Sequence, residues 1–194
     1  PRQFDISKID FELLSREFAH TRRKNLLLRD LDELVNQQLA KMLFANPQRI
    51  DYYDRYQEII DAYNAEQNRA TIEKTFMDLM ELASSLDTEQ QRYVREGFSS
   101  DEELSVYDLL FSENLTKQEI ETIKKVSVDL LTKIKQQIAK LDHWTDKQET
   151  KAIVDNLIRK TLWQELPNSY DVSDIQTYQK KIYEYVYMRY PEVA

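Results

Sequence analysis

The sequence contains no cysteine, one glycine and two histidines among its 194 residues. The absence of cysteine excludes disulfides, thiolate nucleophiles and zinc sites built on cysteine. The single glycine, Gly97, excludes a Walker A loop and a dinucleotide-binding loop, because both need several glycines where backbone N–H groups approach phosphate. His20 and His143 lie far apart in the chain, outside any H-E-x-x-H motif. A histidine-rich metal site is therefore not expected.

Long hydrophobic runs are also lacking. No apolar stretch approaches the roughly 18 residues that a membrane-spanning helix needs, and we expect no membrane partner. Hydrophobic residues make up 41% of the chain and charged residues 32%, which is typical of a folded, soluble protein. The chain starts at Pro1 rather than Met, so we expect it to be a piece of a longer polypeptide.

Apolar residues recur with helical spacing along nearly the whole chain. One glycine and four prolines also favour helices, because sheets need many tight turns. We therefore predict an all-α fold, an irregular multi-helix bundle of about nine helices with no sheet. The expected helices lie at about residues 10–18, 24–45, 47–63, 72–86, 88–98, 100–111, 116–141, 145–165 and 173–190.

The stretch from Thr116 to Trp163 predicts two long helices joined by a short turn at residues 142–144. The buried stripe expected on the second of these helices is Ile153, Val154, Leu157, Ile158 and Leu162. Capping boxes, in which Ser or Thr precedes Glu or Gln by three residues, mark the expected starts of both helices and of two others. They are Thr116–Glu119, Thr145–Gln148, Ser100–Glu103 and Ser173–Gln176. Gly97 is expected to end a short helix in the left-handed conformation.

Asn46-Pro47 and the polar segment 64–69 are the best candidates for a subdivision of the chain. Asn is a good helix cap, and Pro is favoured at the first helical position. We predict a helical segment at residues 1–45, continuous with an upstream helical domain of a parent protein. Residues 46–194 would then form a C-terminal helical domain.

Charge is unevenly distributed. Residues 51–115 carry 5 basic and 16 acidic side chains, whereas residues 116–160 carry 10 basic and 7 acidic ones. The basic stretch can either contact phosphates or be an ordinary solvated surface, with Asp155 bridging Lys151 and Arg159. The spacing of four from Lys147 to Arg159 suggests one ridge of a helix. The candidate DNA or phosphate contacts are Lys124, Lys125, Lys133, Lys140, Lys147, Lys151, Arg159 and Lys160.

Aromatic residues give a second set of candidates. Tyrosines near the end of the chain cover more than one helix face, and tyrosine is common both in cores and at interfaces. Trp144 at the predicted turn either fills that turn or anchors a protein interface. The candidate assembly residues are Trp144, Thr150, Tyr185 and Tyr187.

One pattern resembles a nuclease site. Glu149-Thr-Lys151, with Asp142 as an earlier carboxylate, matches part of the PD-(D/E)xK motif, whose carboxylates bind Mg²⁺. That motif is built on adjacent strands, whereas this triplet lies in a predicted helix, where Glu149 and Lys151 point about 200° apart. The match is therefore interpreted as chance. No pattern predicts a catalytic, metal-binding or cofactor-binding residue.

Short motifs in a consistent order resemble the C-terminal end of the motor and endonuclease subunit, HsdR, of type I restriction–modification enzymes, most closely the IC type. The similarity covers almost the whole chain. The motifs are Ile9-Asp-Phe-Glu12 with Phe18 and Lys24-Asn25; Asn46-Pro-Gln-Arg49; Tyr56-Gln-Glu-Ile-Ile60 with Tyr63-Asn64; Glu102-Glu-Leu104 with Tyr107-Asp-Leu-Leu110; Leu115-Thr-Lys117 with Ile123-Lys-Lys125; Trp144 with Lys147-Gln148, Thr150 and Ala152; Leu166-Pro167 with Tyr170; and Tyr185-Val-Tyr187 with Tyr190-Pro191.

This resemblance implies a non-catalytic domain of a bacterial, cytoplasmic enzyme that cleaves DNA after ATP-dependent translocation. The nuclease and motor motifs, with ATP and Mg²⁺, would lie upstream, and no cofactor is expected in this chain. The expected partners are the methyltransferase and specificity subunits and double-stranded DNA. The alternative is a generic helical protein–protein interaction module without nucleic-acid contact.

Overall fold

The computed structural model describes residues 9–192, which contain nine α-helices and no strand. This confirms the predicted all-α class. Contacts divide the chain into two compact units, Pro1–Arg92 and Tyr93–Ala194. The boundary therefore falls at residue 92, and the expected division after residue 45 lies inside the first unit, because the helix before it packs on a later helix of that unit. The expected continuity of residues 1–45 with an upstream domain stays a prediction.

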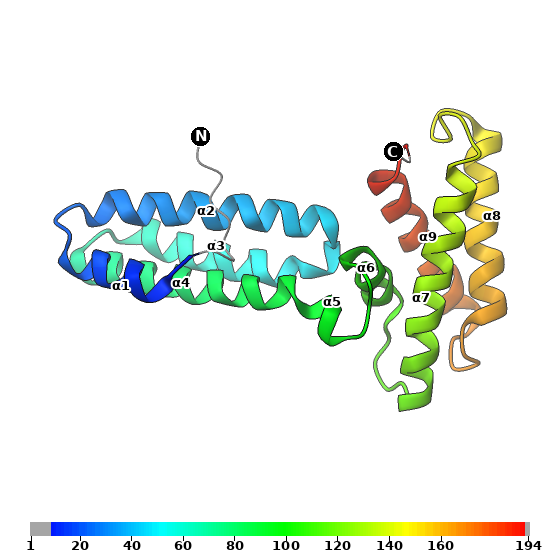
Figure 1. Cartoon of the computed structure of the whole chain (residues 1–194), viewed down its shortest axis with the longest axis horizontal. Coiled ribbons are helices and arrows are strands. Elements are labelled where there is room, and N and C mark those ends of the chain that lie inside the picture. The colour runs from blue at the N-terminus through cyan, green and yellow to red at the C-terminus, as the bar shows by residue number, and fades with distance from the viewer. Residues whose placement is uncertain (1–8, 193–194) are drawn as a thin grey trace. The chain divides into compact units, whose positions relative to one another are not determined.

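The first unit is built around one long helix. It contains α1 (Phe11–His20), α2 (Lys24–Ala45), a 3₁₀ turn (Pro47–Arg49), α3 (Ile50–Ala65) and α4 (Arg69–Gln90). Helices α2 and α3 both pack along α4 (Figure 1). Their apolar faces form one core, in which Phe18 of α1 stacks on Phe76 of α4 with ring centroids 3.7 Å apart.

Polar side chains fix the ends of these helices. Asp10 caps α1 by accepting a hydrogen bond from the Leu13 N–H at 3.0 Å, and Asn46 accepts one from the Gln48 N–H at 3.1 Å. The predicted Asn-Pro break is therefore confirmed. Asn68 caps α4 through the Thr71 N–H at 2.9 Å, which starts that helix within the segment predicted as a loop.

A buried ion network closes one end of the first unit. Arg49, with a side chain only 3% exposed, donates from Nε to Glu89 Oε1 at 3.0 Å. Arg92 adds bonds from Nε to both Glu89 oxygens, and Tyr52 Oη lies 3.4 Å from Oε2. Burial acts to raise the pKa of Glu89, but the hydrogen bonds from Arg92 and Arg49 outweigh it, and its pKa falls below the ordinary value.

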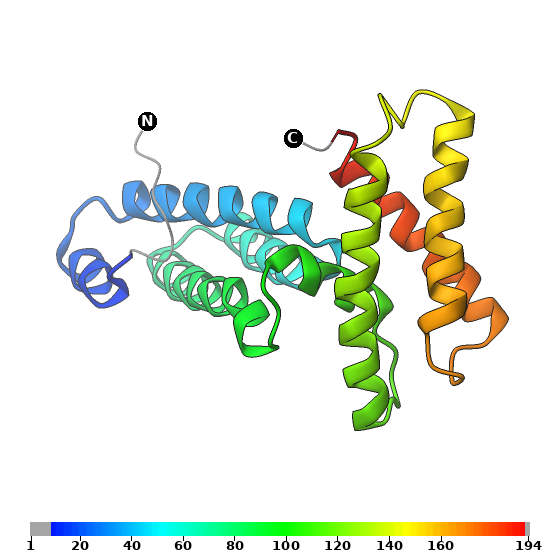
Figure 2. The same ribbon diagram turned by 45° about the vertical axis from the view of Figure 1, so that its right-hand side comes forward.

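The second unit contains α6 (Asp101–Leu110), α7 (Lys117–Ile138), α8 (Gln148–Glu165) and α9 (Val172–Arg189), preceded by the short α5 (Arg92–Arg95). Helices α7 and α8 run antiparallel as the predicted hairpin, and α9 crosses α8 and also contacts α6 (Figure 2). Their buried faces share a single core, which extends from Phe98 to Tyr190.

The Thr116–Glu119 capping box is confirmed, with the Glu119 N–H donating to Thr116 Oγ1 at 3.2 Å and the Thr116 N–H donating to Glu119 Oε2 at 2.8 Å. Ser100 caps α6 through the Glu103 N–H, but the Glu103 carboxylate accepts from the Ser99 N–H instead of that of Ser100. Sequence spacing therefore identified both helix starts.

The two other predicted boxes are wrong. α8 starts at Gln148 with Lys147 at the cap position, because the Thr145 region is part of the turn that surrounds Trp144. α9 starts at Val172, where Asp171 and Asp174 form the box two residues before the predicted Ser173. Both errors arise because several capping residues stand close together in the sequence.

The loop before α6 needs its glycine. Gly97 has φ +85°, the left-handed conformation predicted for it, and its N–H donates to the Val94 carbonyl at 3.1 Å. The predicted helix at 88–98 is instead divided, because α4 continues to Gln90 and α5 follows. Within residues 9–192, no helix combines the length and apolar character needed to cross a membrane.

Candidate functional site

Two of the eight candidate phosphate-binding residues are held in ion pairs on α7. Lys124 Nζ lies 3.1 Å from Glu96 Oε2 and donates to the Glu96 carbonyl at 3.0 Å. Lys133 Nζ lies 2.5 Å from Asp129 Oδ2 and 2.6 Å from Glu165 Oε1. The hydrogen bonds from Asp129 and Glu165 raise the pKa of Lys133. These two charges therefore serve to tie α7 to the segment before α6 and to the end of α8.

Lys135, a third lysine of α7, is bonded to Glu102 of α6 in the same way. The acidic segment 96–103 thus supplies carboxylates to the basic face of α7. This pairing lowers the positive charge that the hairpin presents to solvent.

The remaining candidates are exposed or half-buried. Lys125, Lys140, Lys147 and Lys160 are exposed, and no ion pair involves them within residues 9–192. They lie on α7, on both sides of the α7–α8 connection and near the end of α8. The eight candidates therefore do not form the single face that their sequence suggests.

Helical geometry explains the dispersion of the predicted ridge. Residues four apart in a helix are offset by about 40°, so three such steps rotate the direction by about 120°. Lys151 accordingly lies over the Tyr187 ring of α9, with Nζ 5.9 Å from its centroid. Asp155 Oδ1 accepts a hydrogen bond from Gln179 Nε2 at 3.0 Å, and Arg159 donates to Asn156 Oδ1 at 3.2 Å. The suggested bridge from Asp155 to both cations is wrong.

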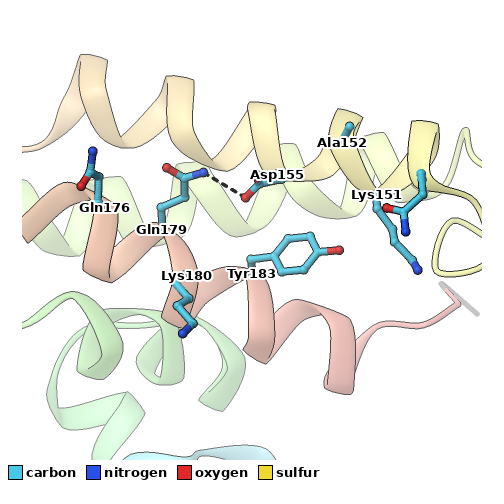
Figure 3. A pocket seen from close by; sticks show the side chains of 8 residues that line it. Lys151, Ala152, Asp155, Gln176, Gln179, Lys180 and Tyr183 are labelled. Atoms are coloured by element: carbon cyan, nitrogen blue, oxygen red, sulfur yellow. Dashed lines mark hydrogen bonds between the residues drawn. The ribbon is translucent and has the colours of Figure 1, made fainter.

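A groove of about 580 Å³ lies between α8 and α9. Figure 3 shows the Asp155–Gln179 hydrogen bond that joins the two helices, with Tyr183 beside it. Burial raises the pKa of Tyr183, and the nearby Asp155 and Tyr187 add to this effect. The lining residues are Gln148, Lys151, Ala152, Asp155, Gln176, Gln179, Lys180 and Tyr183.

Two lysines and three glutamine amides give this groove an excess of hydrogen-bond donors, which suits phosphate oxygens or backbone carbonyls. The α9 residues that line the groove were not identified as candidates from the sequence. Gln176, Gln179, Lys180 and Tyr183 have the spacing of one helix face, and this pattern could have indicated them.

Two of the predicted assembly residues belong to the core. Trp144 is fully buried, and its Nε1–H donates to the Tyr190 carbonyl at 2.7 Å. Its ring meets Tyr183 and Tyr187 edge-on at centroid distances of 6.1 and 5.8 Å. Tyr185 is only 5% exposed. Trp144 therefore fills the turn, and neither residue presents a surface to a partner.

Thr150 and Tyr187 differ in their roles. Thr150 Oγ1 donates to the Trp144 carbonyl at 2.6 Å and lies 3.0 Å from the Lys147 carbonyl, so it fixes the turn at the start of α8. Tyr187 remains 37% exposed. It is the only one of the four assembly candidates, all within the described residues, that combines a large aromatic ring with solvent exposure.

Two exposed apolar residues on α8 were not identified from the sequence. Ile153 is 42% exposed although the apolar periodicity placed it in the buried stripe, and Trp163 is 48% exposed. The nuclease-like triplet Glu149-Thr-Lys151 lies within α8, as expected. No group of three or more His, Asp or Glu among residues 9–192 is arranged to hold a metal ion.

Comparison with known proteins gives one family. The model of the C-terminal region of type I restriction enzyme HindI endonuclease subunit-like proteins matches residues 2–190. No curated protein matches the chain, and no solved structure matches it. The matched region covers both helical units and nearly all of the sequence, so the chain belongs to the family of C-terminal domains of type I restriction enzyme HindI endonuclease subunit-like proteins.

Proposed function

We propose that this chain is a non-catalytic assembly domain, which docks an endonuclease subunit onto the methyltransferase and specificity subunits of a type I restriction enzyme. The supporting observation is the pair of exposed apolar side chains on α8 of the second unit, where Ile153 is 42% and Trp163 48% exposed. Tryptophan is enriched among the residues that contribute most of the binding energy at protein interfaces. Nuclease and ATP-dependent motor chemistry would then belong to other parts of the subunit.

The direct test is a pull-down with the 194-residue chain as bait and the purified methyltransferase–specificity assembly as prey, with and without DNA. Assembly through protein contacts predicts capture in both conditions. A second arm adds excess chain to a reconstitution of the full enzyme, where it should compete with the intact endonuclease subunit. Absence of both capture and competition would refute the assembly role.

A supporting contact with double-stranded DNA is a second candidate function. It rests on the exposed cations Lys125, Lys140 and Lys147 around the α7–α8 connection and on Lys151 and Lys180 in the nearby groove. No ion pair involves Lys125, Lys140 or Lys147 among residues 9–192, and Lys180 Nζ lies 4.0 Å from Glu184 Oε1. Exposed lysines without a carboxylate partner are available to replace counterions on phosphates. In this proposal DNA contact adds to assembly and does not replace it.

The test of DNA contact is fluorescence anisotropy with a duplex at several salt concentrations. The logarithm of affinity should fall with the logarithm of salt concentration by roughly 0.9 per phosphate contacted. The double substitution Lys147→Glu and Lys151→Glu should weaken binding and reduce this slope, while circular dichroism stays unchanged. A slope of zero would refute the DNA contact, as would unchanged translocation and cleavage by the double variant of the full enzyme. Protein contacts would then be the only remaining function.

A further inference from the structure

One face of α8 carries the aromatic residue of that helix, Trp163, together with cations that no carboxylate of residues 9–192 pairs with. Ile153, Asn156, Lys160 and Trp163 fall within an arc of about 80° on a regular helix, and Arg159 lies next to them. We call these five residues the α8 outer face. Helices α7 and α9 pack on other sides of α8 (Figure 2), and the α8 outer face is exposed to solvent.

The apolar residues of this face stand at its two ends. Ile153 and Trp163 are ten residues apart, which corresponds to about 15 Å along the helix axis. A solvated face normally carries polar residues at such positions. Burying both side chains would stabilise a complex in proportion to the apolar area covered. Tryptophan is also the residue type most enriched among binding hot spots.

The charges of the face point to the chemistry of its partner. Lys124, Lys133 and Lys135 on α7 each have a carboxylate partner within the second unit. Arg159 donates to the neutral Asn156 amide, and among residues 9–192 no ion pair involves Arg159 or Lys160. The carboxylates on either side are engaged elsewhere, because Asp155 accepts from Gln179 and Glu165 from Lys133.

Building on the proposed assembly role, we propose that the α8 outer face docks an acidic amphipathic surface of a partner subunit within the restriction enzyme. That surface would supply carboxylates for Arg159 and Lys160 and apolar pockets about 15 Å apart for Ile153 and Trp163. A protein is favoured over duplex DNA, because an exposed isoleucine gains nothing from a phosphate backbone and two cations account for few phosphate contacts.

The absence of cysteine from the chain allows a site-specific footprint. Asn156→Cys introduces a single thiol at the centre of the face, and Met188→Cys introduces one on α9 as the control. The rate of maleimide labelling is measured for each variant alone and with the purified methyltransferase–specificity assembly. We expect the assembly to slow labelling at position 156 by about tenfold or more, as for a residue inside a water-excluding interface, and to leave position 188 unchanged.

Affinity measurements form the second arm of the test. Trp163→Ala should weaken binding to the same assembly by about tenfold or more, as for an interface hot spot, and Met188→Ala should not. Arg159→Glu with Lys160→Glu should also weaken it. Lys125→Glu with Lys140→Glu, which changes the net charge equally, is the matched control.

The outcomes separate this inference from the proposed function. Complex formation with unprotected labelling at position 156, and with full affinity for Trp163→Ala, would overturn the docking face but retain the assembly role. Failure of the wild-type chain to form any complex would overturn both. Two further results would contradict the inference. Concentration-dependent protection at position 156 by the chain alone would identify a second copy as the occupant. Loss of duplex binding as the only defect of Trp163→Ala would identify DNA as the occupant.

Discussion

Replacing Glu89 by Gln should destabilise the first unit while leaving the second unit unchanged. Glu89 is 5% exposed and joins Arg49 of the 3₁₀ turn to Arg92 beyond the end of α4. The neutral amide is nearly the same size, so the change removes charge and hydrogen-bond acceptors without leaving a large cavity. The buried Arg49 guanidinium then loses its carboxylate.

The expected cost is about 3 kcal/mol. Removing one partner of a buried ion pair typically costs about 3–5 kcal/mol, and the lower end applies here because the Arg92 side chain is 26% exposed and can reach water. With a denaturant dependence of roughly 1–1.5 kcal/mol/M for a unit of this size, the urea midpoint should fall by about 2–3 M. Glu81→Gln, an exposed carboxylate on the same helix, is the control and should change stability by less than about 0.5 kcal/mol.

The two units can be followed separately, because both tryptophans, Trp144 and Trp163, belong to the second unit. Far-UV circular dichroism reports the helices of both units, whereas tryptophan fluorescence reports the second alone. Glu89→Gln should shift a part of the dichroism transition and leave the fluorescence transition in place. Equal shifts in both signals would show that the units unfold together, and no shift in either would show that the network contributes no stability.

The remaining predictions concern pH and two single residues. The pKa of Glu89 is lower in the folded state than its ordinary value of 4.5, so the stability it contributes is present above about pH 4.5 and is lost as pH falls through the folded pKa; urea titrations from pH 7 to pH 3 should show this loss in the wild type and less of it in Glu89→Gln. Trp144→Phe leaves the Tyr190 carbonyl without its buried donor and should cost about 1–3 kcal/mol, measured by dichroism as a lower urea midpoint for the second unit; an unchanged midpoint would contradict the assigned role in the turn. Gly97→Ala meets no atom within 4 Å but must adopt φ +85°, so it should cost about 1–2 kcal/mol from backbone strain alone, and the same measurement on Gly97→Asn should show a smaller loss.

Much of the fold could be predicted from the sequence, because each helix buries one regularly spaced face. The Asn46-Pro47 break, the Thr116–Glu119 box and the left-handed Gly97 all depend on residues within a few positions of one another. The predicted starts of α8 and α9 were wrong, because several residues that can cap a helix stand close together there. Trp144 orders the turn before α8, and Asp171 caps α9 ahead of Ser173.

The candidate site could be predicted less well, because its properties depend on pairs that are distant in sequence. Lys124 pairs with Glu96, 28 residues away, and Lys133 with Glu165, 32 residues away. A sum of charges along the chain cannot show these pairs. The periodicity likewise placed Ile153 with the buried stripe, although α8 exposes it together with Trp163.

The most direct measurement of the assembly role is isothermal titration of the 194-residue chain into the purified methyltransferase–specificity assembly, without DNA, at about 0.15 M and 0.5 M salt. We expect a saturable complex at both concentrations, with a negative heat-capacity change from apolar burial. Salt should weaken it only moderately, because the α8 outer face combines Trp163 and Ile153 with two cations. No heat of binding at either concentration, or binding that needs DNA, would contradict the assembly role.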